Sequence, residues 1–184
     1  MPFATLFLAA ALGTAPPVAA APMPTGEALT AQIGAHDARL FWAVFEGCDA
    51  KALPDLLAPD FRMIHDKGGL AEPSRDAMVA DVAKSCANRQ PGGTQAGYKN
   101  RRLLVPGSHR VRAMGDWGAL EEGAHVFFEW NDRETRWDMV GGAHYMHLWQ
   151  WMPAEARFRL SQSYSYDHDG AAPYPPAPGP QPRT

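Results

Sequence analysis

The second half of the chain reads as a series of long β-strands, and this pattern limits the fold more than any other feature. Residues that favour strands dominate five segments, near Arg101–Val105, Arg110–Met114, Trp117–Trp130, Arg136–Trp151 and Arg157–His168. Turn-forming residues separate the last three segments. Because consecutive strands joined by short turns pair antiparallel, we expect a meander of long strands.

The first half of the chain reads as helices. Apolar residues recur at helical spacing from about Gly26 to Asp49, and a second, short helix is expected from Lys51 to Leu57. Ser74 can cap a third helix that runs to about Asn88. Helices followed by strands are typical of an α+β fold. We therefore expect a cone-shaped α+β barrel, with the N-terminal helices packed on a curved antiparallel sheet and a pocket between the two layers.

The two ends of the chain differ from its middle. Residues 1–21 hold an uncharged apolar run followed by small residues, which is typical of a secretory signal peptide and too short for a stable membrane span. The alternative is a frayed, Ala-rich N-terminus. We expect a periplasmic or secreted protein, a single domain over residues 26–169, and a Pro-rich, disordered tail over residues 170–184.

Charge and cysteine content narrow the class of protein. The chain has 17 Lys and Arg against 20 Asp and Glu, with no basic block, so nucleic-acid binding is not expected. Its two cysteines, Cys48 and Cys86, suggest a disulfide in an exported protein, and two buried thiols are the alternative. Neither a phosphate-binding Gly-rich loop nor a Gly-x-Ser-x-Gly elbow is present. We expect no cofactor.

Five stretches of sequence carry a resemblance to a known family. They are DFRMIHDKGGL (Asp60–Leu70), GSHRV (Gly107–Val111), EGAHVFF (Glu122–Phe128), AHYMHLW (Ala143–Trp149) and FRLSQSYSYDH (Phe158–His168). With the helices, the sequence from about Ala28 to His168 resembles the nuclear transport factor 2-like superfamily, which includes SnoaL-like cyclases and ketosteroid isomerases. The most similar branch is an exported bacterial one, known only as a domain of unknown function. The resemblance implies the cone-shaped fold and its pocket. It does not imply ketosteroid isomerase activity, because the catalytic residues of that enzyme cannot be matched here one by one.

Strand pairing gives a first arrangement of the pocket. A turn at Pro153–Ala156 pairs residues whose numbers sum to about 309, and a turn within Asn131–Thr135 pairs residues whose numbers sum to about 266. His125, Gly141 and His168 then share one row and one face of the sheet. The same, concave face is expected to carry Phe127, Glu129, Tyr145, His147, Trp149, Gln162, Tyr164 and Tyr166. The opposite face is expected to carry Ser161, Ser163, Ser165 and Asp167.

The residue types on the concave face suit acid–base chemistry. An imidazole titrates near neutral pH, and a phenol can donate to a developing oxyanion. We therefore expect the catalytic residues to be His65, His125, His168 and Tyr166. We expect the residues that bind the ligand or orient an imidazole to be Asp66, Glu129, Tyr145, His147, Trp149 and Gln162. The alternative for each residue is a structural role, in which a buried polar atom only needs a partner.

These observations predict an exported protein that binds a small hydrophobic or aromatic molecule. Turnover would be of the isomerase, dehydratase or cyclase kind, and the sequence leaves open whether the protein is an enzyme. A non-catalytic binding module, or one that forms a homodimer, is the alternative. A metal-dependent enzyme is a third hypothesis, and it requires His65, His125 and His168 to converge. We assign no metal site, because no compact ligand motif is present.

Overall fold

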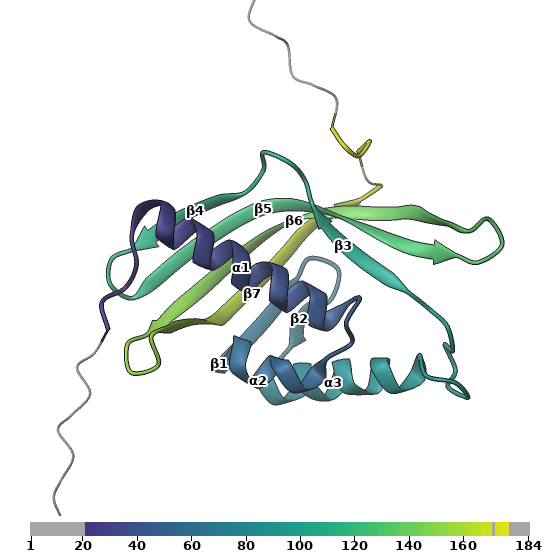
Figure 1. Ribbon diagram of the computed structural model, residues 1–184, viewed down its shortest axis with the longest axis horizontal. Helices are drawn as coiled ribbons and strands as arrows, with labels where there is room; N and C mark the ends of the chain where they lie inside the picture. Colours follow the sequence, from purple (N-terminus) through teal and green to yellow (C-terminus); the bar gives the residue numbers. More distant parts are fainter. Residues whose placement is uncertain (1–20, 171, 177–184) are drawn as a thin grey trace, which may run out of the picture.

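The computed structural model describes residues 21–170 and 172–176, and its regular elements run from Gly26 to Asp169 (Figure 1). The helices are α1 (Gly26–Val44), the short 3-10 turn η1 (Ala50–Ala52), α2 (Leu53–Leu56) and α3 (Arg75–Asn88). The strands are β1 (Leu57–His65), β2 (Gly69–Glu72), β3 (Asn100–Leu104), β4 (Arg110–Met114), β5 (Gly118–Asn131), β6 (Arg136–Met152) and β7 (Arg157–Asp169). The predicted signal peptide lies outside the described residues except for Ala21, and so does most of the predicted tail. Among the described helices, none has the length and apolar character needed to cross a membrane.

All seven strands belong to one curved sheet with the order β2-β1-β7-β6-β5-β3, and β4 also pairs with β5 (Figure 1). The pairings among β5, β6 and β7 are antiparallel, as the sequence predicts. β1 instead pairs with β7 in parallel, so the sheet is mixed. The sheet also does not close into a barrel, because β2 and β3 lie at its two ends. The expected α+β cone is confirmed, with these two corrections.

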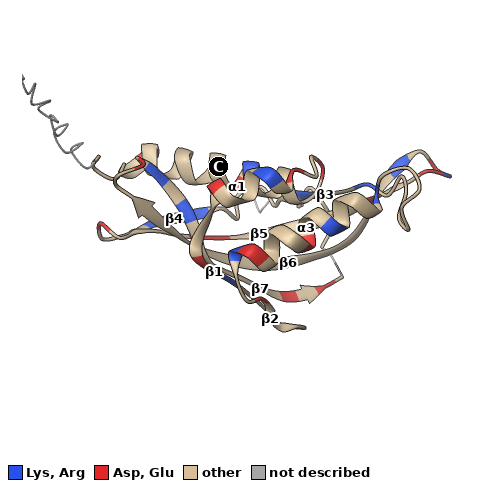
Figure 2. Cartoon of the chain, turned by 90° about the horizontal axis from the view of Figure 1, so that it is seen from below, with Lys and Arg blue, Asp and Glu red and all other residues tan. Residues whose placement is uncertain are grey.

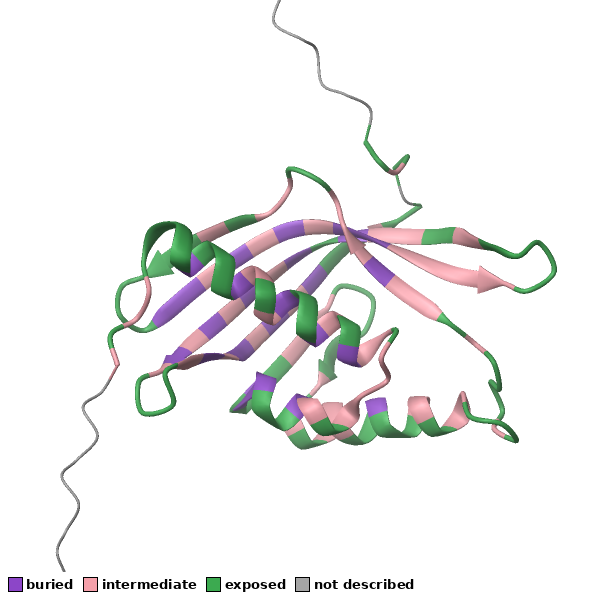
Figure 3. Ribbon diagram, in the orientation of Figure 1, coloured by how far each residue is buried: buried purple, intermediate pink, exposed green. Residues whose placement is uncertain are grey.

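The helices cover the concave face of the sheet. α1 and α3 lie on the same side of it in two perpendicular views (Figures 1 and 2). α1 buries one side chain every three or four residues, and the buried positions of Figure 3 concentrate where α1 faces the strands. Burial of apolar surface in this layer supplies the main favourable term for folding. The core includes Leu29, Ile33, Leu40, Leu53, Leu56, Phe61, Trp149, Trp151, Phe158 and Leu160.

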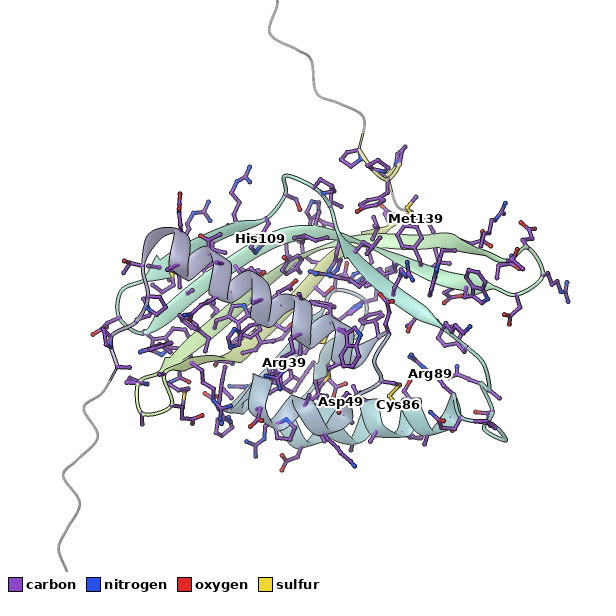
Figure 4. All side chains as sticks on the ribbon, in the orientation of Figure 1. Arg39, Asp49, Cys86, Arg89, His109 and Met139 are labelled. Carbon is purple, nitrogen blue, oxygen red and sulfur yellow. A yellow bond between two sulfur atoms is a disulfide. The ribbon has the colours of Figure 1, made fainter. Side chains whose placement is uncertain are left out.

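Two local contacts hold α3 in place. The Oγ of Ser74 accepts a hydrogen bond from the backbone N–H of Ala77 at 3.2 Å, which is the cap that the sequence predicts. At the other end of the helix, Cys86 forms a disulfide with Cys48, with the two Cα atoms 5.5 Å apart (Figure 4). α1 ends at Val44, before the predicted Asp49, because the chain turns there toward this disulfide.

The pairing of β6 with β7 begins in the predicted register and then shifts by one residue. The pairs from Met152 with Arg157 to Trp149 with Leu160 are as predicted, and Ser161 is then left without a partner as a bulge. A shift of one residue moves every later side chain to the other face. Beyond the bulge, the concave face of β7 therefore carries Ser163 and Ser165. The convex face carries Gln162, Tyr164 and Tyr166, contrary to the prediction.

A second irregularity returns His168 to the concave side. Asp167 has φ of +56°, in the left-handed region that residues other than glycine seldom adopt. Pairing jumps there from His144 with Tyr166 to Gly142 with Asp169. The predicted face of His168 is right, although the predicted neighbour is wrong, because the β6–β7 pairing resumes with Gly142 opposite Asp169.

The pairing of β5 with β6 differs from the prediction by two residues. His125 lies opposite Ala143 and not opposite Gly141. Because side chains alternate with a period of two, this error leaves the β5 side chains up to Phe127, where the register shifts, on their predicted faces. His125, Tyr145 and His147 accordingly point to the concave side, where all three are buried.

Candidate functional site

A cavity of about 370 Å³ lies between the concave face of the sheet and the helices. Its walls are mainly apolar and include Phe41, Phe61, Met63, Val82, Phe127 and Leu160. Its polar lining includes His65, Glu72, His125, Tyr145, His147, Ser163, Ser165 and His168. A mostly apolar cavity with a few polar groups, at this volume, suits a small organic molecule.

The mouth of the cavity carries two stacked imidazoles. The ring centroids of His65 and His168 are 4.0 Å apart, and Asp66 lies beside both. The Nδ1 of His168 lies 2.7 Å from Oδ1 of Asp66, whose other oxygen accepts the backbone N–H of His168 at 3.1 Å. This backbone hydrogen bond is the main reason why the pKa of Asp66 is lowered. Asp66 thus holds both the ring and the backbone of His168.

Hydrogen bonds fix the tautomers of the two imidazoles at the mouth. Because an ionised carboxylate only accepts, the Nδ1 of His168 carries the hydrogen, and its Nε2, 3.2 Å from the Oγ of Ser165, is an acceptor. The Nδ1 of His65 accepts from the backbone N–H of Lys67 at 3.1 Å. Burial, followed by the charge of His168, lowers the pKa of His65. When its ring is neutral, His168 therefore presents Nε2 as the acceptor.

His125 differs from His168 in which ring nitrogen carries the hydrogen. The Nε of Arg102 donates to its Nδ1 at 3.1 Å, so the hydrogen of the neutral ring is on Nε2. This Nε2 is buried and has no hydrogen-bond partner within the part of the chain that the structure describes. Burial, and then the positive charge of Arg102, lowers the pKa of His125 to about 2. His125 is therefore a neutral ring whose free N–H, on Nε2, can donate a hydrogen bond.

A buried ion pair stands behind His125. Arg102 on β3 donates to both carboxylate oxygens of Asp37 on α1, at 2.6 and 3.2 Å. The Arg102 guanidinium also lies 3.7 Å from the ring centroid of Phe41, in a cation–π contact. Fixed on three sides, Arg102 holds the ring of His125 in one orientation.

Glu121 is the centre of a second buried network. It is fully buried and accepts from the indole of Trp149 at 2.7 Å and from the phenol of Tyr145 at 3.3 Å. It also lies within hydrogen-bond distance of His147 and of His109, which reaches it from the β3–β4 loop (Figure 4). Burial alone would raise the pKa of Glu121, but the hydrogen bonds of the two histidines outweigh it and hold the pKa at about 2.

Three of the predicted binding residues therefore direct polar atoms at Glu121 and not at a ligand. Tyr145 and His147 line the cavity, yet each has a polar atom directed at this carboxylate. Trp149 donates to Glu121 and does not line the cavity. Burial, and then the negative charge of Glu121, raises the pKa of Tyr145, so its phenol stays protonated.

Three other predicted residues lie away from the cavity. Tyr166 is on the convex face, where its ring stacks on His144 with centroids 5.8 Å apart, and Gln162 is on that face too. Glu129 lies past the bulge in the β5–β6 pairing and accepts from the phenol of Tyr98 at 2.6 Å. These placements rule out direct roles for Tyr166, Gln162 and Glu129 at the cavity.

The prediction missed Asp37, Arg102, Glu121 and Ser165. Asp37 falls four residues after Ile33 and three before Leu40, so it is a carboxylate on the apolar stripe of a helix. Glu121 precedes His125 by four residues on one strand and therefore shares its face. Those two signals are present in the sequence. Arg102 and Ser165 carry no comparable local signal.

In the part of the chain that the structure describes, two groups of side chains have donor atoms within 4.8 Å of one another, as a metal site requires. One is His65, Asp66 and His168, and the other is Asp37, Glu121 and His147. His125 belongs to neither group, so the three-histidine set does not converge. In the first group the Nδ1 of His65 already accepts from Lys67, and in the second the carboxylates accept from Arg102 and Trp149. Hydrogen bonds therefore explain why the donor atoms of each group lie close together.

No family model matches the sequence, and no curated protein shows a significant match to it. The structure resembles many solved structures. A nuclear transport factor 2-like superfamily protein from Salmonella enterica is 13% identical, with a TM-score of 0.58 over 83% of this chain and 98% of that one. ActVI-ORFA from Streptomyces coelicolor is 11% identical, with a TM-score of 0.61 over 77% of this chain and 98% of that one. A protein from Catenulispora acidiphila, solved in complex with S-DNPA, is 14% identical, with a TM-score of 0.59 over 76% of this chain and 95% of that one.

At these identities the likeness concerns the backbone and not the active site. The structure of this chain nevertheless shows the curved sheet, the covering helices and the cavity between them, independently of the likeness. The chain therefore has the nuclear transport factor 2-like fold.

Proposed function

We propose that this protein binds a small apolar molecule that carries a hydrogen-bond acceptor, such as a carbonyl oxygen, and acts on it by acid–base chemistry. The observation that carries the proposal is the Nε2 of His125, a buried N–H without a hydrogen-bond partner among the described residues, at a cavity with apolar walls. A buried donor left without a partner costs about 1–3 kcal/mol, and a ligand oxygen would remove that cost.

His125 and His168 have different roles in the proposed chemistry. His125 is held neutral by Arg102, so it can donate to a carbonyl oxygen and stabilise the negative charge that forms there. His168 presents the lone pair of Nε2, and Asp66 stabilises the imidazolium that forms when this atom takes a proton. Removal of a proton beside a carbonyl is the step shared by isomerase, dehydratase and cyclase reactions.

Export to an oxidising compartment is part of the proposal. A disulfide between Cys48 and Cys86 supports it, because such bonds persist in the periplasm and outside the cell. The backbone of Ala21 is bound to Pro153, and its carbonyl accepts from the indole of Trp151 at 3.1 Å. A processed chain that keeps these contacts would begin at Ala21 or before it, and mass spectrometry of the exported protein would show its first residue.

A matched pair of ligands tests the binding site. 1-Acetylnaphthalene and 1-ethylnaphthalene have similar shapes, but only the first carries a carbonyl. We expect the ketone to bind roughly ten times more tightly, which corresponds to one hydrogen bond. His125→Leu should abolish the preference, whereas His144→Leu on the convex face should retain it. Equal or absent binding of both ligands by the wild-type protein would contradict the proposal.

Proton abstraction has its own readout. In deuterated water the wild-type protein should accelerate exchange of the methyl hydrogens of the bound ketone, because they lie next to the carbonyl. His168→Gln should lose this exchange and keep the binding. Binding without exchange in the wild-type protein would leave the non-catalytic binding module as the function. A homodimer through the convex face belongs to that alternative, and light scattering would measure it.

A further inference from the structure

We propose that Ser165 is a nucleophile and that this protein transfers the acyl group of small apolar esters to water. The proposal rests on the juxtaposition of Asp66, His168 and Ser165 at the mouth of the cavity. Oδ1 of Asp66 lies 2.7 Å from Nδ1 of His168, and Nε2 of the same ring lies 3.2 Å from Oγ of Ser165. This is the order of contacts by which a serine hydroxyl is activated in serine hydrolases of unrelated folds.

The direction of each hydrogen bond suits proton removal from Ser165. Asp66 accepts both from the ring and from the backbone N–H of His168, so the ring is held with its hydrogen on Nδ1. In the neutral ring the lone pair of Nε2 then faces the hydroxyl, which can donate to it across 3.2 Å. No rotation of a side chain is needed to form the array.

Ser165 owes its position to the bulge at Ser161. Without that bulge, Ser165 would face away from the cavity, as simple alternation predicts. With it, Ser165 is buried and lines the cavity. Its backbone also joins it to the first strand, because its carbonyl accepts from the N–H of Asp66 at 3.0 Å and it pairs with His65. The nucleophile and its activating groups therefore lie on two adjacent strands, β7 and β1.

A neighbouring serine provides an internal comparison. Ser163 also lines the cavity and is equally buried, two residues earlier on the same strand. Among the described residues, however, its hydroxyl makes no hydrogen bond to an imidazole, whereas that of Ser165 does. The two serines differ mainly in the presence of a base, which makes Ser163 the matched control.

The reaction proceeds in two balanced steps. Ser165 gives its proton to Nε2 of His168 as Oγ bonds to the ester carbon, and the alcohol then leaves with that proton. Water next gives a proton to His168 as its oxygen bonds to the acyl carbon, and Oγ leaves and takes the proton back. The products are an alcohol and a carboxylic acid, and no other reactant is consumed. The unpaired N–H of His125 lines the same cavity and is the donor available to the oxyanion.

This inference rests on the proposed ligand site, because the ester must enter the same cavity. Phenylmethylsulfonyl fluoride, a small aromatic reagent that sulfonylates activated serines with loss of fluoride, tests it by intact-mass measurement. We expect one adduct on the wild-type protein, mapped to Ser165 by peptide fragmentation. Ser163→Ala should still form the adduct, whereas Ser165→Ala and His168→Gln should not react.

Hydrolysis of p-nitrophenyl butyrate provides the second readout. We expect Ser165→Ala to reduce the rate roughly 100-fold or more, and at least about ten times more than Ser163→Ala, which alters only the cavity wall. Ser165→Ala should still bind 1-acetylnaphthalene, which shows that it is folded and keeps the ligand site. A wild-type protein that binds the ketone but gives no adduct and no hydrolysis would overturn this inference and leave the proposed function intact. Equal modification of Ser165→Ala would overturn it as well.

Discussion

The guanidinium Nε of Arg102 donates to Nδ1 of His125 across 3.1 Å, and the same side chain is bound at its other end by Asp37. The buried ion pair of Arg102 and Asp37 thus determines which ring nitrogen of the neutral His125 carries the hydrogen. The consequence reaches the cavity, because the tautomer of His125 decides whether that ring donates to a ligand or accepts from it. The ion pair therefore belongs to the site although it is not directed into the cavity.

Removal of Arg102 should destabilise the protein strongly. Arg102→Met leaves Asp37 buried without its cation, which costs about 3–5 kcal/mol for a pair of this kind. The double variant Asp37→Leu/Arg102→Met removes both charges and should be more stable than Arg102→Met alone. Urea unfolding measures both. Arg101→Met, on the same strand and partly exposed, should cost about 1 kcal/mol or less. A double variant no more stable than Arg102→Met would contradict this account.

The stability of the protein should fall below about pH 6.5 in a way that depends on His125. The unfolded chain protonates this histidine with a pKa near 6.5, whereas the folded pKa is about 2. Between these values the unfolded state binds the extra proton, so acidification favours unfolding by up to ~1.4 kcal/mol per pH unit. His125→Gln should lose this dependence, which amounts to roughly 2 kcal/mol between pH 6.5 and pH 5.

The difference between the wild type and His125→Gln in how the free energy of unfolding depends on pH separates the effect of His125 from that of the other ionisable groups. His109, whose hydrogen bond to Glu121 raises its pKa, contributes with the opposite sign, but it is present in both proteins. Glu121 has a lowered pKa, so its contribution is lost only as the pH falls from about 4.5 toward 2. Identical pH dependence of unfolding in the wild type and in His125→Gln above pH 5 would show that His125 is not held neutral.

Gly123 should tolerate no side chain. A Cβ at this position would lie 2.7 Å from the ring of Tyr145, which is fully buried and cannot move aside. Gly123→Ala should therefore cost about 1–3 kcal/mol and weaken ketone binding, because Tyr145 lines the cavity. Gly141→Ala is the control, since a Cβ there would make only an ordinary contact at 3.7 Å. Thermal unfolding and the ketone titration check both, and equal effects of the two variants would refute the role of the close contact.

The sequence predicts the fold well because the fold depends on periodicity. The strand segments and the cap at Ser74 follow from local patterns, and the structure reproduces them to within a residue or two. An error of two residues in the β5–β6 register changed neighbours without changing faces, so His125 was placed correctly. A prediction that depends only on the alternation of side chains along a strand is unaffected by a register error of two residues.

The site is less predictable because single-residue irregularities decide it. The bulge at Ser161 exchanges the faces of the serines and tyrosines on β7, and the left-handed Asp167 then restores the face of His168. Neither feature has a marker such as glycine in the sequence. Arg102 is similar, because its importance comes from contacts with α1 and β5 that only the folded chain brings together.

The disulfide should stabilise both the fold and the wall of the cavity. It closes a segment in which Cys48 and Cys86 are 38 positions apart, and constraint of an unfolded chain over such a loop is worth about 3–4 kcal/mol. Phe45, which lines the cavity, precedes Cys48 by three residues, and its carbonyl accepts from Arg89, which follows Cys86 by three, at 3.0 Å.

We therefore expect Cys48→Ala/Cys86→Ala to lose about 3–4 kcal/mol in urea unfolding and to bind 1-acetylnaphthalene more weakly than the wild type. Dithiothreitol should lower the stability of the wild type to that of the double variant and leave the variant unchanged. If the reductant has no effect on the wild type while free thiols become measurable, the covalent link does not stabilise the domain. If stability falls but ketone affinity does not, the wall at Phe45 is held by Arg89 and its other contacts and not by the disulfide.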